Sequence, residues 1–113
     1  MNLKQIITEI DFKILSRELD FSTIEVSNGY VSDLMSCVMA GASKNDLWVT
    51  LQSHSNIVAI AALLDLSAII ITEDSQPNEE TIAKANQENI ILLSTPLSSF
   101  NVVGKLWEFG IRA

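Results

Sequence analysis

Three short polar segments carry the side chains whose types and spacing could do chemistry. Each follows an apolar run and precedes a segment typical of a helix, so hydroxyl, amide, imidazole and carboxylate groups gather where strands are expected to end. A helix N-terminus offers free backbone N–H groups and a partial positive charge, which suit a phosphate or a carboxylate. The candidate ligand-binding residues, for a small anion such as a nucleotide, are Gln52, Ser53, His54, Ser55, Asn56, Thr72, Glu73, Ser94 and Thr95.

A catalytic interpretation of His54 finds little support in its neighbours. A histidine base needs a nucleophile within reach and a carboxylate that orients it. Ser53 and Ser55 flank His54 in the chain, and adjacent residues rarely point into one site. We therefore assign no catalytic residue, and His54 is expected to face a ligand or to cap a helix.

No cofactor or metal site is predicted from the motifs. The chain has one histidine and one cysteine, too few for a cluster of zinc ligands. It lacks G-x-G-x-x-G, and Gly104-Lys105 has neither the upstream glycine nor the following Ser or Thr of a phosphate loop.

Helix capping is the simpler alternative for each hydroxyl in these segments. Parallel α/β domains place Ser and Thr at helix starts because their side chains accept backbone N–H groups. Ser32, Ser75 and Thr95 are the cap candidates, with Pro96 at a first helical position. Only the joint arrangement of the three segments favours a ligand site over caps.

The elements that position these segments alternate regularly from residue 47 onward. Apolar runs at 47–51, 68–72 and 90–94 predict strands, and segments 55–65, 75–89 and 95–110 predict helices. Strands that are apolar on both faces indicate a parallel sheet covered by helices, hence an α/β fold. Right-handed crossovers would place the carboxyl ends of all three strands on one edge.

The N-terminal part is less regular, and residues 1 to about 30 are expected to form a lobe of a single domain spanning 1–113. The pattern predicts a helix over 3–10, strands at 12–15 and 22–26, and a turn at Asn28-Gly29. A further helix is predicted from near Asp33 to Gly41.

Composition limits the classes of partner. The net charge is −7 and the seven basic residues are scattered, which argues against nucleic acid and against an anionic membrane surface. The longest apolar stretch, 57–71, is interrupted by Asp65 and Ser67 and is too short to span a bilayer. The lone Cys37, expected to be buried, cannot form an internal disulfide, which fits the cytoplasm.

Apolar residues are abundant for so small a sheet. The helix at 55–65 is apolar nearly all round, and the C-terminal helix has an apolar face of Phe100, Val103, Leu106 and Trp107. A symmetric homodimer would bury the excess, so we expect one.

Three segments resemble the DRTGG domain family, in particular its small stand-alone bacterial and archaeal forms: NGYVSDLMSCVMAGA, LWVTLQSHSNIVAIAALLDLSAIIIT and LLSTP. The resemblance rests on Tyr30-x-Ser32-Asp33-Leu34-x-Ser36 and on the strand–Gln–x–His–x–Asn–helix element. It implies a three-layer α/β/α fold with a mainly parallel sheet, similar to the N-terminal domain of the HPr kinase/phosphorylase. It also implies a regulatory or dimer-forming module, such as occurs beside CBS domains in regulatory pyrophosphatases. Some stand-alone forms are associated with iron-only hydrogenase systems.

The sequence departs from the motif that names the family. Asp20-Phe21-Ser22-Thr23 and Asn28-Gly29 occupy the corresponding region, without an arginine and without a contiguous D-R-T-G-G. If that arginine binds an anion in relatives, this chain has kept the fold of the family and lost the ligand.

The sequence is therefore compatible with three functions. The first is a non-catalytic regulatory or dimerisation module that senses a small anionic ligand at the strand ends. The second is a protein–protein interaction subunit with no small-molecule ligand, for example in a hydrogenase system. The third and weakest is a small hydrolase or phosphotransferase built on His54, Glu73 and Asp74.

Overall fold

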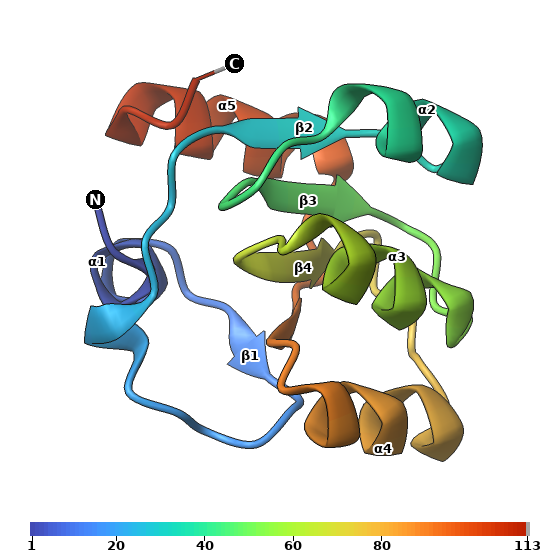
Figure 1. Ribbon diagram of the computed structural model, residues 1–113. Coiled ribbons are helices and arrows are strands. Elements are labelled where there is room, and N and C mark those ends of the chain that lie inside the picture. Colours follow the sequence, from blue (N-terminus) through green and yellow to red (C-terminus); the bar gives the residue numbers. More distant parts are fainter. Residues whose placement is uncertain (113) are drawn as a thin grey trace.

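A five-stranded sheet forms the middle layer of the structure, a computed structural model that describes residues 1–112 (Figure 1). Its strand order is β1-β5-β4-β3-β2, and all neighbours are parallel except β1, which runs antiparallel to β5. The predicted α/β class with a mainly parallel sheet is confirmed. The strands are β1 (Lys13–Ile14), β2 (Gly29–Val31), β3 (Leu47–Thr50), β4 (Ala68–Ile71) and β5 (Leu92–Ser94).

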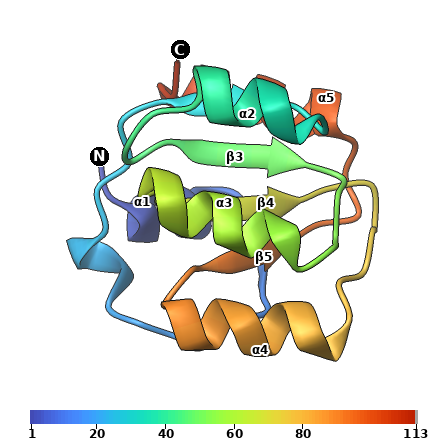
Figure 2. The same cartoon turned by 45° about the vertical axis from the view of Figure 1, so that its right-hand side comes forward.

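Helices cover both faces of the sheet and complete the three layers. The crossover helices α2, α3 and α4 lie together on one face, while α1 and α5 pack on the other (Figures 1 and 2). The helices are α1 (Leu3–Glu9), the 3₁₀ helix η1 (Phe21–Thr23), α2 (Met35–Gly41), α3 (Asn56–Leu64), α4 (Glu79–Glu88) and α5 (Ser99–Phe109).

Alternation of side chains along the central strands divides the core into two clusters. Trp48 and Ile69 pack with α2, α3 and α4, whereas Val49 and Ile70 pack with α1 and α5. All four are buried. Burial of both sheet faces is the reason that these strands read as continuous apolar runs.

Two predictions for residues 22–31 are wrong. Asn28-Gly29 is not a turn, because Gly29 begins β2, which is parallel to β3. The Asn28 carbonyl accepts the Leu47 N–H and the Gly29 N–H donates to the Arg112 carbonyl, both at 2.9 Å, so neighbours on two sides hold this pair extended. Residues 22–26 form no strand, since Phe21–Thr23 is the η1 turn and only Glu25 bridges to Asn2.

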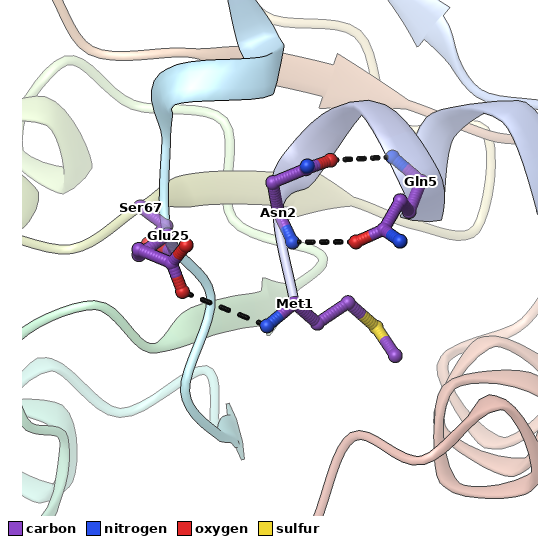
Figure 3. Close-up of polar contacts among 5 residues, drawn as sticks. All are labelled: Met1, Asn2, Gln5, Glu25 and Ser67. Carbon is purple, nitrogen blue, oxygen red and sulfur yellow. Dashed lines mark hydrogen bonds and ion pairs between the residues drawn. The ribbon is translucent and has the colours of Figure 1, made fainter.

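The first residues are tied to the sheet rather than packed loosely beside it. Asn2 and Gln5 form a capping box at the start of α1, and the Met1 ammonium lies 3.5 Å from a Glu25 carboxylate oxygen (Figure 3). The Glu25 carbonyl accepts the Ser67 hydroxyl just before β4. The predicted helix over 3–10 and the strand within 12–15 are confirmed as α1 and β1.

The predicted caps of α4 and α5 are wrong by three residues. Asn78 caps α4 by accepting the Thr81 N–H, and Ser98 caps α5 by accepting the Asn101 N–H. The predicted stop of α5 is confirmed, because Gly110 has the left-handed φ of 110° that favours glycine.

In α2, only Val38 is buried, and Cys37 is exposed, contrary to expectation. Ser32 accepts the Leu34 N–H but α2 begins later, at Met35. None of the helices within residues 1–112 has the length and hydropathy needed to cross a bilayer.

Candidate functional site

The carboxyl ends of β2, β3, β4 and β5 meet at one edge of the sheet, as parallel pairing requires. Backbone hydrogen bonds continue past the strands there: the Thr72 N–H donates to the Thr50 carbonyl and the Thr95 N–H to the Ile71 carbonyl. The three predicted polar segments therefore do lie on one edge. Their side chains differ in what they contact.

Asp33, just after β2, is the centre of the first polar cluster. One of its carboxylate oxygens accepts the Thr50 hydroxyl and the Leu51 N–H, each at 2.8 Å. Gln52 donates its side-chain amide to the Asp33 carbonyl at 3.2 Å. The ends of β2 and β3 are thus joined by side chains that bond one another.

Thr72 and Glu73, just after β4, bond to the start of α5. The buried Thr72 hydroxyl lies 2.5 Å from the Ser99 hydroxyl, and the Glu73 carboxylate accepts the Ser99 N–H at 2.8 Å. Glu73 and Asp74 have positive φ angles of 60° and 57°, and their N–H groups donate to carbonyls of the loop after β5. Because Glu73 already occupies the N-terminus of α5, that helix end is closed to another anion.

His54 acts locally at the start of α3. Its exposed imidazole accepts the Asn56 N–H through Nδ1 at 3.1 Å. Ser55 is the N-cap residue but makes no side-chain cap bond, and the Ser53 carbonyl accepts the Thr81 hydroxyl of α4. Within residues 1–112, no hydrogen bond joins His54 to Thr72, Glu73, Ser94 or Thr95.

Ser94 and Thr95, both buried, line a separate hollow of about 290 Å³ where the start of β1 passes the end of β5. The Thr95 hydroxyl accepts the Leu97 N–H at 3.2 Å. Lys13 is the cationic side chain of this hollow, and two carboxylates also border it. The lining residues are Asp11, Phe12, Lys13, Asp74, Gln76, Ser94, Thr95 and Pro96.

Four residues of this edge were not among the candidates predicted from the sequence: Lys13, Asp33, Thr50 and Ser99. Asp33 follows β2, whose first residue, Gly29, was expected to lie in a turn, so the end of this fourth parallel strand was not predicted. Lys13 reaches the edge because β1 is antiparallel and starts where β5 ends. A strand assigned to 29–31 would have been the signal for Asp33.

The charge of this edge is mainly negative. Asp33, Glu73 and Asp74 are exposed there. No group of three or more potential metal ligands drawn from His, Cys, Asp and Glu occurs within residues 1–112.

The pKa of the Asp20 carboxyl is lowered because the Ser22 hydroxyl and N–H bond its ionised form. Asp20 lies just before η1 in the N-terminal segment and is not part of the strand-end edge.

Comparison with known proteins gives a family and a fold. The family model described as the DRTGG domain matches residues 6–109. No curated protein matches the sequence. A similar solved structure is that of the CBS and DRTGG domains of the regulatory region of Clostridium perfringens pyrophosphatase, complexed with the activator diadenosine tetraphosphate. It is 20% identical, with a TM-score of 0.74 over 92% of this chain and 45% of that one. The chain thus spans less than half the length of that neighbour, and the likeness shows the fold alone.

Proposed function

The chain belongs to the DRTGG domain family, and we propose that it is a non-catalytic regulatory module of the cytoplasm that acts by self-association. The observation that carries the proposal is the contrast between its polar and apolar surfaces. The polar strand-end groups bond one another, whereas Phe100 is 92% exposed and Trp107 is 52% exposed on α5. Large exposed aromatic side chains mark protein contact surfaces.

The geometry of the polar edge does not favour catalysis. A general base has to reach the proton that it removes. The Nδ1 atom of His54 accepts a backbone N–H two residues on, and Glu73 caps α5. These roles are structural, so the hydrolase hypothesis built on His54, Glu73 and Asp74 gains no support.

Sensing of a small anionic ligand is the second candidate function. Two observations favour it: the neighbour's regulatory region binds a dinucleotide activator, and Lys13 lines the same hollow as Ser94 and Thr95. Phosphate groups would approach this cation from solvent. Against it stand Asp11 and Asp74 at the same hollow, which repel anions.

Sedimentation equilibrium of the full chain, from low to high micromolar concentration, tests the first proposal. We expect a reversible dimer, and a monomer at every concentration would overturn the proposal. The alternative of an interaction subunit with an unlike partner would then take its place.

Thermal unfolding with ATP, AMP, diadenosine tetraphosphate or inorganic phosphate tests the second candidate. A ligand that binds the folded state raises the unfolding temperature. If sensing occurs, at least one compound raises it for the wild type and Lys13→Gln loses that rise. Lys105→Gln, at an exposed position on α5, is the control. No rise with any compound would leave self-association without a nucleotide input.

A further inference from the structure

One side of α5 is apolar and open to solvent. Phe100, Val103, Gly104 and Trp107 follow the i, i+3, i+4, i+7 spacing that places residues on one side of a helix. Lys105 and Glu108 border a different hollow, together with Glu9 of α1, and Glu108 is the acidic residue next to Gly104 along the helix surface. We call the four residues Phe100, Val103, Gly104 and Trp107 the α5 stripe.

An apolar hollow of about 170 Å³ lies beside the C-terminal half of this stripe, between α5 and the edge strand β2. Its volume is close to that of an apolar cavity of about 150 Å³ that holds a benzene molecule. It carries no acidic side chain, and its one charged group, Arg112, stacks on Trp107 at 4.7 Å. The lining residues are Gly29, Tyr30, Val31, Val49, Val103, Leu106, Trp107, Ile111 and Arg112.

We propose that a second copy of this chain docks on the α5 stripe, with Phe100 of each copy in the β2–α5 hollow of the other. The two α5 helices would run antiparallel and cross at Gly104, the middle residue of Ser99–Phe109. Phe100 and Trp107 are about 10 Å apart along the helix axis, one on each side of Gly104. The same surface then meets itself, as a two-fold contact requires.

Gly104 suits the crossing point. A Cβ atom built there meets no other heavy atom within 4 Å, so the space above it is open. A residue without a side chain lets two helix backbones approach closely. Val103 and Trp107 border the approach on the β2 side.

Local charge complementarity supports a second copy as the occupant. The net charge of −7 on each chain opposes association, but the hollow has no acidic side chain, so docking there buries no carboxylate from its lining. In the proposed antiparallel arrangement, Arg112 beyond the C-terminal end of one α5 would come near Glu73 at the N-terminal end of the other. Glu73 is held there by its bond to the Ser99 N–H. The opposed helix dipoles add to this complementarity.

The exposed area fits a reversible pair. At 92% and 52% exposure, Phe100 and Trp107 present roughly 300 Å² of surface per chain, given about 200 Å² for a whole aromatic side chain. The aromatic side chains of two copies would thus bury roughly 600 Å² together. This is about half of the total area, about 1,200 Å², that a small stable interface buries. Val31, which is 50% exposed and lines the same hollow, would add to this area.

This inference rests on the proposed self-association, and its test uses variants on the full chain. Phe100→Ser removes the inserted ring, and Gly104→Leu fills the crossing point while favouring the helix. Each is expected to raise the dimer dissociation constant by at least about tenfold in sedimentation equilibrium, as loss of a central aromatic contact does. The matched control is Leu63→Ser, since Leu63 is 67% exposed on α3, on the opposite face.

The outcomes separate the two claims. A wild-type dimer that neither Phe100→Ser nor Gly104→Leu weakens, or that Leu63→Ser weakens equally, would overturn the docking surface and leave self-association intact. A wild-type chain that stays monomeric would overturn the proposed function itself. Acrylamide quenching gives a second readout: Trp107 should become protected as the wild-type concentration rises, whereas Trp48 is 0% exposed throughout.

Discussion

The strand-end edge and the α5 stripe differ in how many of their side chains already have partners within the chain. At the edge, Asp33, Thr72 and Glu73 each have partners in a neighbouring element. On the stripe, Phe100 and Trp107 remain largely in water. A polar cluster next to parallel strands is thus not by itself an open binding site, because here its groups join neighbouring loops. The surface left without partners here is apolar.

The largest effect on folding is expected from removing the Asp33 carboxylate at the centre of the polar edge. Asp33→Ala deletes the acceptor of two hydrogen bonds and leaves the Thr50 hydroxyl without an acceptor for its proton. Since hydrogen bonds to charged groups contribute about 1.5 to 3 kcal/mol, we expect the free energy of unfolding to fall by about 2 kcal/mol in urea denaturation.

Asp11→Ala is the matched control for Asp33→Ala, because Asp11 is exposed and makes no hydrogen bond within the described residues. Its effect should be within about 0.5 kcal/mol. If both variants lost the same free energy of unfolding, the hydrogen bonds of Asp33 would contribute nothing to stability, which would contradict its structural role.

A smaller loss is expected at the next contact along the edge. Thr72→Val keeps the shape of a buried side chain but removes the hydroxyl that meets Ser99. A neutral hydrogen bond contributes about 1 kcal/mol, so the free energy of unfolding should fall by about that amount. The double variant with Ser99→Ala should lose less than the sum of the two single losses; strict additivity would show that the two hydroxyls do not interact.

The stripe should show almost no effect on folding. Phe100→Ser is expected to change the free energy of unfolding of the dilute, monomeric chain by less than about 0.5 kcal/mol, because the ring buries little surface and the two residues have similar helix propensities. Urea denaturation well below the dimer dissociation constant measures it. A loss above about 1 kcal/mol would place Phe100 in the core and end the contrast between the two regions.

The central β–α units could be predicted from the sequence because a buried parallel strand is continuously apolar. Strands predicted at 47–51 and 68–72 match β3 and β4 within a residue. Edge strand β2 was missed because it has three residues, begins with Gly29, and owes its extended form to neighbours on both sides rather than to its own pattern.

The caps show a different limit. Thr95 and Ser98 are both suitable caps, but the chain has to pass from β5 to the α1–α5 face before α5 begins, and that passage uses Thr95 to Leu97. Likewise, Glu73 and Asp74 bend the chain after β4, so the N-cap of α4 is Asn78 and not Ser75. The local sequence pattern therefore locates a helix start only to within a few residues, because the length of the preceding loop decides which of several suitable residues becomes the cap.

The polar edge and the stripe depend on contacts between distant residues. Asp33 and Thr50 are 17 positions apart, and no local motif marks them as a pair. The C-terminal helix was correctly read as amphipathic, but of its predicted apolar face only Leu106 is fully buried and Val103 partly so, while Phe100 and Trp107 are exposed. Periodicity shows that a helix has an apolar side, not how wide a part of that side its own sheet covers.

The backbone bridges at Asn2–Glu25 and Asn28–Arg112 have a practical consequence for protein engineering. Residues 25 and 28 are only three positions apart, so both ends of the described chain run beside one short extended segment, about 10 Å long. A brief glycine-rich connector should therefore suffice to fuse them. New termini could then be opened elsewhere, or the unit could be inserted into a surface loop of a host protein with little separation between the two junctions.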